Sequence, residues 1–379
     1  MRQFLRGVWP VIRRELGMMR RDSNIMMVLV AGPLVYTILF GLVYERARVY
    51  RIPIIVVDED RSVSSRAVIR NLDAGESVAV AGVISSREEL PGRFMNEECW
   101  SAVVIPEEFE RSLKRGDPAE LLMLTNGSNI ITGNYAQRGV QGVLAAAGGA
   151  AAVEGLMRGG EPRGAALATY APVALQTRVL FNPASNYANF VMPLLLMLLV
   201  HQVVILGCGM SWASEPGRGS ASGGVPGTPL QLFAGKSTPY FALTIFWILF
   251  GILFTHSWLA IPFGGDLAGM LLLGILSGTC LATIGSLLGT LIRSKVGLVQ
   301  MVFFTSMPLL LVSGGSWPLA AMPKGVRLFS LLLPSTHMME IYSRMALESA
   351  GIGILWPSYA WLSLIATGLL LLRRAVGAR

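Results

Sequence analysis

The chain has 379 residues, of which 53% are hydrophobic and only 14% are charged, and its mean hydropathy is +0.56. A typical globular chain contains roughly 25% charged residues, so this composition excludes an ordinary soluble protein. The net charge is +8, and the three cysteines are too few for a disulfide-built fold. We therefore expect a membrane protein.

The first predicted element is an amphipathic helix in the basic segment at the start of the chain. At helical spacing, residues 1–21 carry an apolar stripe with arginines between its members, which predicts an amphipathic helix on an anionic membrane surface. The alternative is a plain basic flank that only orients the next segment. The stripe consists of Phe4, Leu5, Val8, Trp9, Ile12, Leu16 and Met19.

Six apolar runs are each long enough to cross a bilayer, which takes about 20 helical residues. No Asp, Glu, Lys or Arg occurs in their interiors. The first run has no small-residue cleavage site after it, so we interpret it as a retained anchor. The runs are 25–44, 189–212, 239–262, 267–292, 296–316 and 354–372.

The charges that flank these runs predict the orientation. Segments 1–24, 213–238 and 373–379, with the short turn 292–296, contain many more basic than acidic residues. Basic flanks stay on the cytoplasmic side, so we expect both termini in the cytoplasm. Segment 45–188 is nearly neutral and is expected outside.

Segment 45–188 alternates short β-branched runs with helical patterns, which favours an α/β domain. A long Ala- and Gly-rich helix is predicted from about residue 129 to 157, followed by a loop-like stretch to residue 186. The predicted strands are 51–58, 78–84, 100–105 and 119–124, and the shorter predicted helices are 64–72, 86–96 and 106–113.

Small residues recur at every fourth position of the fourth run. They allow close approach of another helix, either as packing within the chain or as a moving or dimeric interface along a transport pathway. The residues concerned are Gly274, Gly278, Ala282 and Ser286. His201 lies in the middle of the second run and is either functional or a neutral histidine hydrogen-bonded to a neighbouring helix.

Motifs for catalysis or cofactor binding are missing from the pattern. His201, His256 and His337 are not brought together by any spacing, so no metal site is predicted. Ala234-Gly-Lys-Ser237 resembles the end of a P-loop, but Leu230 stands where that pattern requires glycine. We expect no catalytic residue, no cofactor and no nucleic-acid partner for this chain.

A series of short motifs resembles the ABC-2 type transport permeases, in the subgroup with a large extracytoplasmic domain after the first span. Their order and spacing cover nearly the whole chain. In chain order they include Arg14-Glu15, Arg20-Arg21-Asp22, Gly32-Pro33, Val56-Val57-Asp58, Ala102-Val103-Val104-Ile105-Pro106, Phe181-Asn182-Pro183, Thr228-Pro229-Leu230, Gly235-Lys236, Ser313-Gly314, Trp317-Pro318, Met322-Pro323 and Leu333-Pro334.

The resemblance implies partners and coupling residues. It implies a separate ABC ATPase subunit that binds ATP and Mg, a second permease subunit in a homo- or heterodimer, a periplasmic membrane-fusion adaptor, and contact with membrane lipid. The residues expected to couple to the ATPase are Glu215, Arg218, Gly219, Ser220, Thr228, Pro229, Leu230, Arg293 and Lys295.

The inner loop departs from the family pattern. The family usually has Arg-Glu-x-Glu-x-Gly-Thr after the second span, whereas residues 212–227 here are rich in glycine and proline. These residues are unfavourable in helices, so the coupling surface is either weakened or ordered only against its partner.

We therefore predict a polytopic α-helical membrane protein with six transmembrane helices and an inserted extracytoplasmic α/β domain, in the bacterial inner membrane. The expected parts are an elbow helix 1–24, a first transmembrane helix 25–44, the α/β domain 45–188, five transmembrane helices in 189–372 and a cytoplasmic tail 373–379. The segment 189–372 includes a cytoplasmic coupling loop 213–238 and an external re-entrant loop 317–353.

The predicted function is that of the permease subunit of an ATP-driven exporter. Its mostly aliphatic spans favour an amphipathic or hydrophobic substrate moved out of the cytoplasm or inner leaflet. A receptor or assembly scaffold that binds a ligand or adaptor through the outer domain is the alternative. A membrane-embedded enzyme ranks last, because no set of catalytic side chains is apparent.

Overall fold

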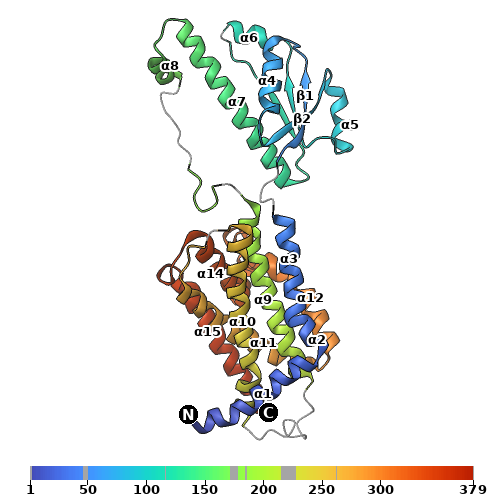
Figure 1. Ribbon diagram of the computed structural model, residues 1–379, viewed down its shortest axis with the longest axis vertical. Helices are drawn as coiled ribbons and strands as arrows, with labels where there is room; N and C mark the ends of the chain where they lie inside the picture. The colour runs from blue at the N-terminus through green and yellow to red at the C-terminus, as the bar shows by residue number, and fades with distance from the viewer. Residues whose placement is uncertain are drawn as a thin grey trace. The chain divides into compact units, whose positions relative to one another are not determined.

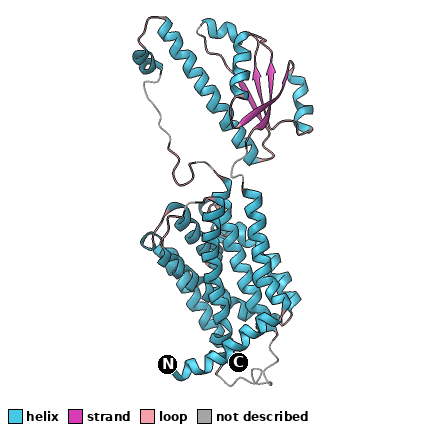
Figure 2. Cartoon of the chain, in the orientation of Figure 1, coloured by secondary structure: helices cyan, strands magenta, loops and turns pink. Residues whose placement is uncertain are grey.

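The computed structural model describes residues 2–45, 50–115, 117–170, 178–183, 186–214, 228–261 and 263–378. Its contacts divide the chain into two compact units. The helical unit comprises residues 1–47 and 179–379, and the inserted unit comprises residues 48–178. Among the described residues, every strand belongs to the inserted unit (Figure 2).

Within the described part of the helical unit, six segments are long and apolar enough to cross a membrane. Each overlaps one of the six predicted runs, and the fourth has the predicted bounds. The segments are α2 to α3 (Ser23–Tyr44), α9 (Tyr187–Ala213), α10 (Pro229–Leu259), α11 (Leu267–Ile292), α12 (Lys295–Val312) and α15 (Ile352–Ala378).

The start of α10 corrects the prediction for the third run. The helix begins at Pro229 rather than at residue 239, because Thr228 caps it and exchanges hydrogen bonds with Gln231 in a capping box. Proline is favoured in the first helical turn, where its missing N–H is not needed. Lys236, which the sequence places in a polar loop, therefore lies inside the helix and is fully buried.

The first apolar segment changes its helical geometry near its middle. It consists of α2 (Ser23–Met26), a π-helical turn η1 (Met27–Ala31) and α3 (Gly32–Tyr44). Pro33 has no N–H, so the Leu29 carbonyl lacks its usual helical donor. The Trp247 indole of α10 donates to that carbonyl at 3.1 Å. The irregular turn is thus satisfied by a neighbouring helix, as an apolar environment requires.

α9 lies at the centre of the helical unit, with α10, α11, α12 and α14 packed against it (Figure 1). Its contact with α11 is close because glycines face it. A Cβ atom on Gly285 of α11 would lie only 2.8 Å from the Ile205 carbonyl oxygen of α9. The two backbones therefore approach in the manner of small-residue helix pairs in membranes.

The segment predicted as a re-entrant loop forms two helices. A short 3₁₀ turn η4 (Leu319–Ala321) precedes α13 (Lys324–Leu331) and α14 (Pro334–Glu348). α14 packs into the main core through Met338, Tyr342 and Met345. The Thr336 hydroxyl donates to the Ser330 carbonyl at 2.7 Å and joins the two helices.

A four-stranded sheet forms the centre of the inserted unit, in the order β2-β1-β3-β4. β1 (Ile52–Asp58) is parallel to β2 (Val78–Ile84) and to β3 (Ser101–Ile105), and β4 (Leu122–Thr125) is antiparallel to β3. β1 is almost continuously hydrophobic because helices cover both faces of the sheet.

Helices cover the two faces of the sheet unequally. On one face lie α4 (Val63–Asp73), α6 (Phe109–Arg115) and α7 (Ile130–Arg158), and on the other lie a 3₁₀ turn η2 (Arg87–Glu89) and α5 (Leu90–Met95) (Figure 1). Leu72 of α4 packs in the hydrophobic core on the first of these faces, and Leu90 of α5 packs in the core on the other face.

α7 is a seventh helix long and apolar enough to cross a membrane, by length and composition alone. Its first half buries Ala136 and Val140 against the sheet. The helix α8 (Arg163–Tyr170) follows it, so the predicted loop-like stretch to residue 186 is wrong over these residues, and 171–177 and 184–185 lie outside the described residues. The short, Ala-rich sequence of α8 has too little apolar periodicity to identify a helix.

Candidate functional site

The first helix, α1 (Arg2–Arg21), packs along the first turns of α10, at the end of the helical unit where both chain termini lie (Figure 1). A Cβ atom on Gly235 of α10 would lie 2.5 Å from Cβ of Val11, so the two helices are in close contact. The Gln231 side chain donates to the Phe4 carbonyl at 3.4 Å. The two helices therefore form one packed element.

Only part of the apolar stripe predicted for α1 lies on the face that packs against α10. The structure buries Val8, Val11 and Glu15, and leaves Leu5, Trp9 and Leu16 exposed. The predicted stripe thus includes one residue of the buried face and three of the exposed face. The sequence could not separate these faces, because both are apolar at helical spacing.

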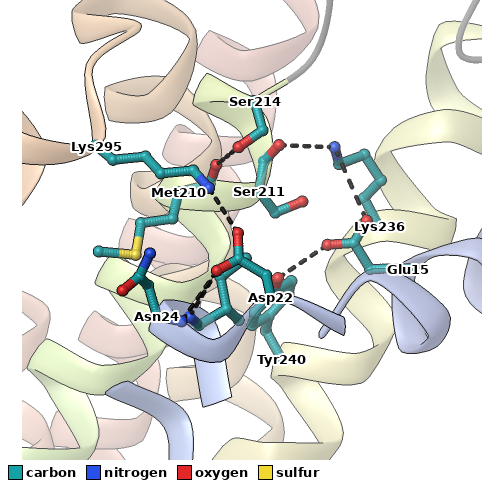
Figure 3. Close-up of polar contacts among 10 residues, drawn as sticks. Glu15, Asp22, Asn24, Met210, Ser211, Ser214, Lys236, Tyr240 and Lys295 are labelled. Atoms are coloured by element: carbon teal, nitrogen blue, oxygen red, sulfur yellow. Dashed lines mark hydrogen bonds and ion pairs between the residues drawn. The ribbon is translucent and has the colours of Figure 1, made fainter. Parts of the chain in front are cut away.

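A buried carboxylate joins α1 to α10. Glu15 is fully buried, and its Oε1 atom accepts a hydrogen bond from the Tyr240 hydroxyl at 2.8 Å (Figure 3). Its Oε2 atom lies 3.8 Å from Nζ of Lys236, which is also fully buried. Because each charge is removed from water, each depends on the other to remain buried.

Lys236 extends this cluster to two further helices. Its ammonium donates to the Ser211 carbonyl of α9 at 3.1 Å and lies 5.0 Å from the centre of the Trp212 ring. The guanidinium of Arg373, on α15, lies 4.3 Å from the same ring. Two cations thus share one indole, an arrangement stabilised by the negative face of the ring.

A second ion pair lies beside the first. Asp22 caps α2 by accepting from the Asn24 N–H at 3.0 Å and the Ile25 N–H at 3.3 Å. Its other oxygen accepts from Nζ of Lys295, the first residue of α12, at 2.6 Å (Figure 3). This hydrogen bond from Lys295 lowers the pKa of Asp22 below its usual value. The beginning of α12 is thereby held to the junction of α1 and α2.

We call the residues Glu15, Asp22, Ser211, Trp212, Lys236, Tyr240, Lys295 and Arg373 the termini-end cluster. Its residues come from α1, α9, α10, α12 and α15, with Asp22 between α1 and α2, and Ser211 contributes its backbone carbonyl. A displacement of α1 would therefore also displace most of the apolar helices. Mechanical transmission, rather than bond chemistry, is what such an arrangement can provide.

The predicted coupling residues fall into three groups. Glu215, Arg218, Gly219 and Ser220 lie outside the described residues. Thr228, Pro229 and Leu230 begin α10, where Leu230 is exposed. Arg293 ends α11 in a left-handed conformation, and Lys295 joins the termini-end cluster.

The predicted ridge on α11 contacts helices of the same chain. A Cβ atom on Gly274 would lie 2.8 Å from Ile245, and one on Gly278 would lie 3.0 Å from Phe241, both on α10. The Ala282 carbonyl accepts from the Cys208 thiol of α9 at 3.2 Å. Ser286 is buried too, and its hydroxyl donates to the Thr283 carbonyl within α11.

The three histidines lie in different places. His201 is buried in α9, and His256 lies in α10 with Nδ1 3.3 Å from the Ile261 carbonyl oxygen. His337 lies in α14, and its ring stacks on Trp361. Within the described part of the chain, no group of three His, Cys, Asp or Glu residues could hold a metal ion.

Sequence reasoning did not identify the Glu15–Lys236 pair, although it noted both residues as parts of motifs. Two signals were available. Glu15 follows Val8 by seven residues, so both lie on the same helical face. Lys236 follows shortly after Thr228 and Gln231, which form a capping box and so mark the start of a helix that includes Lys236. Neither signal shows that the two charges meet.

Comparisons with known proteins place the chain among transporters. Residues 24–372 match the model for "ABC-2 family transporter protein". The chain is 25% identical over 368 residues to the probable multidrug ABC transporter permease YbhR of Escherichia coli K12, covering 95% of each chain. It is 24% identical over 343 residues to the probable multidrug ABC transporter permease YbhS of the same strain, covering 88% of this chain and 87% of the relative.

A further relative is the inner membrane transport permease YhhJ of Escherichia coli K12. The chain is 30% identical to it over 200 residues, which is 52% of this chain and 53% of the relative. No solved structure matches the chain.

Proposed function

The chain belongs to the ABC-2 family of transporter proteins and is a permease subunit of an ABC transporter, and on this premise we propose that it is an exporter subunit. It would move an amphipathic or hydrophobic substrate out of the cytoplasm or the inner leaflet. The names of YbhR and YbhS as probable multidrug permeases support this substrate class. ATP and Mg would bind to a separate ATPase subunit.

The proposed topology has six spans, both termini in the cytoplasm and the inserted unit outside. The two chain ends lie at the same end of the helical unit (Figure 1), as an even number of crossings requires. The basic residues that flank the spans support the orientation. A second permease subunit and a periplasmic adaptor complete the proposed assembly, from the family resemblance.

The observation that carries the proposal is the buried link between α1 and α10 through Glu15, Lys236 and Tyr240. Separating the two helices would part a buried ammonium from the buried carboxylate that balances its charge, which is costly. An ATPase that displaces α1 would therefore move α10 with it. The Lys236 bond to α9 and the Lys295 bond to Asp22 would carry the movement to the other spans.

The first experiment is purification of the tagged chain from native membranes in mild detergent, followed by an ATPase assay of the eluate. We expect an ABC ATPase subunit to co-purify, and its activity to change when the permease is removed. Recovery of the folded chain without any ATPase subunit would contradict the export proposal.

A matched pair of variants tests the link itself. Glu15→Gln retains the size of the side chain but removes the buried charge, whereas Glu154→Gln changes an exposed glutamate of α7. We expect Glu15→Gln to retain the ATPase partner while reducing substrate-dependent ATP hydrolysis about tenfold or more, the range of a typical coupling free energy. Equal activity of the two variants would contradict the proposed role of Glu15.

A further inference from the structure

A shallow pocket opens in the inserted unit between α4 and the ends of β1 and β2. Its volume is about 430 Å³, which lies within the range of small-molecule sites. None of its residues belongs to the termini-end cluster. The lining consists of Asp58, Arg61, Arg66, Ile69, Arg70 and Val83.

The topology of the sheet favours a ligand at this position. β1 and β2 are parallel neighbours, and the helices that follow them, α4 and α5, pack on opposite faces of the sheet. The chain therefore leaves the carboxyl ends of these two strands in opposite directions. Asp58 is the last residue of β1, and Val83 is the next-to-last residue of β2. Open α/β sheets bind ligands outside the carboxyl ends of their strands, and Asp58 ends β1, which borders the reversal of strand order between β1 and β3.

The polar side of the pocket is strongly cationic. Arg61, Arg66 and Arg70 form no ion pair with any acidic side chain among the described residues. The one carboxylate of the lining, Asp58, offsets only one of the three positive charges, and its oxygens bond to neutral donors rather than to a guanidinium. Oδ1 accepts from the Arg61 N–H and Oδ2 accepts from the Ser65 hydroxyl, each at 2.8 Å.

Asp58 also shapes the loop that presents the arginines. Its bond to the Arg61 N–H accompanies a left-handed backbone at Arg61, whose φ angle is 53°. The guanidinium of Arg66 donates to the Arg61 carbonyl at 3.1 Å. Arg66 and Arg70 are four residues apart on α4, so they lie on one face of the helix. The three cations thus surround one opening.

The other side of the pocket is apolar. Ile69 lies between two of the arginines in sequence, and Val83 is 52% exposed although it belongs to a strand of the sheet. Val83 pairs with Val56 in the parallel register, so its side chain lies on the α4 face. An apolar group could cover this surface while remaining close to the cations.

We propose that this pocket binds a small amphipathic anion. A carboxylate or phosphate group of the ligand contacts Arg61, Arg66 and Arg70, and its apolar part packs on Ile69 and Val83. Guanidinium groups are well suited to both anions, because their N–H groups form paired hydrogen bonds to oxygen atoms. The proposal does not depend on ATP-driven export, and its test requires no transport.

The test uses the full chain purified in a nonionic detergent, with phenyl phosphate and benzoate as probes. Both carry one anionic group and one apolar ring, and both remain soluble outside micelles. Benzyl alcohol and benzylamine are the neutral and cationic controls. Binding is measured by saturation-transfer NMR and calorimetry. We expect a Kd on the order of 1 mM or tighter for at least one anion, which weakens as the salt concentration rises.

Variants assign the binding to this pocket. R61Q/R66Q/R70Q should weaken binding about tenfold or more, whereas R61K/R66K/R70K should retain much of it because the charges remain. Arg115→Gln, an exposed arginine of α6 outside the pocket, is the matched control and should bind as the native chain does. Circular dichroism checks that each variant is folded.

Any one of three results would overturn the proposal. One is the absence of anion binding up to the highest soluble concentration of both probes. Another is equal binding by the native chain and the folded glutamine triple variant. Equal binding of phenyl phosphate and benzyl alcohol would likewise show that the arginines do not select an anion.

Discussion

Two ion pairs, one from each unit of this chain, differ sharply in their exposure to water. In the helical unit, Glu15 and Lys236 are fully buried with 3.8 Å between their charged atoms. In the inserted unit, Glu59 and Arg87 approach to 2.7 Å, but their side chains remain 20% and 49% exposed. The Glu59–Arg87 contact is the shorter of the two, but the attraction between its charges is the weaker. Water solvates these exposed charges whether or not they meet.

This difference shows that burial, rather than distance, determines what an ion pair does. A buried pair contributes little net stability, because desolvation of both ions offsets their attraction. Its importance lies in what happens when the partners separate, since each then remains charged in an apolar environment. The Glu15–Lys236 pair therefore resists relative movement of α1 and α10, whereas an exposed pair such as Glu59–Arg87 allows movement.

The largest effect is expected from breaking the buried pair. Glu15→Ala leaves the Lys236 ammonium buried opposite a cavity, and we expect the free energy of unfolding to fall by about 3–5 kcal/mol. Denaturant unfolding in detergent, followed by tryptophan fluorescence, measures the change.

The double variant Glu15→Ala/Lys236→Met is the control for that prediction. It removes both charges and fills part of the space, so it should recover most of the lost stability. If the double variant were less stable than Glu15→Ala, the interpretation of a mutually dependent pair would be wrong.

A smaller effect is expected where α1 and α10 pack by shape alone. In Gly235→Ala, the new methyl group would lie 2.5 Å from Cβ of Val11, and we expect a loss of about 1–3 kcal/mol from overpacking. Gly17→Ala on α1 is the matched control, because no atom lies within 4 Å of its added methyl group. That variant should gain up to about 1 kcal/mol from helix propensity. The same sign for both substitutions would refute close packing at Gly235.

Trp247→Phe should have a more modest effect, of about 1 kcal/mol. The substitution retains an aromatic ring but removes the donor to the Leu29 carbonyl, which Pro33 leaves without its helical partner. Amide hydrogen exchange over residues 27–33 should increase in this variant. Unchanged exchange there would show that the π-helical turn is satisfied without the indole.

The sequence predicted the apolar segments well, since a continuous hydrophobic run is a local signal. It also predicted the alternation of strands and helices around β1, because short β-branched runs differ visibly from helical spacing. It did not predict that Glu15 is buried. The partners of Glu15 lie more than two hundred positions away, and only the packing of α1 on α10 brings them together.

The sequence also did not predict that the helix of the third run begins as early as Pro229, for a related physical reason. Residues 229–238 are mixed in polarity, so they lower any average hydropathy and resemble a loop. Lys236 is compatible with a buried helix only because a carboxylate, a carbonyl and an indole ring surround its ammonium. Compensation of that kind depends on tertiary structure and leaves no pattern in the local sequence.

The smallest effect, and the one that completes the comparison, is expected at the surface pair of the inserted unit. The hydrogen bond from Arg87 lowers the pKa of Glu59 below its usual value of 4.5. A carboxyl group with a lowered pKa stabilises the fold above its unfolded pKa, and this contribution is lost as the pH falls through the lower folded pKa. Arg87→Gln should therefore differ slightly from the native chain at pH 7 and not at all in strong acid. Added salt should reduce the difference further, because the pair is exposed.

Hydrogen exchange of the β1 amides between pH 3 and pH 7, converted to opening free energies, measures the difference between Arg87→Gln and the native chain. Arg115→Gln is the control. A loss at pH 7 as large as that of Glu15→Ala would show that exposure does not separate the two kinds of pair.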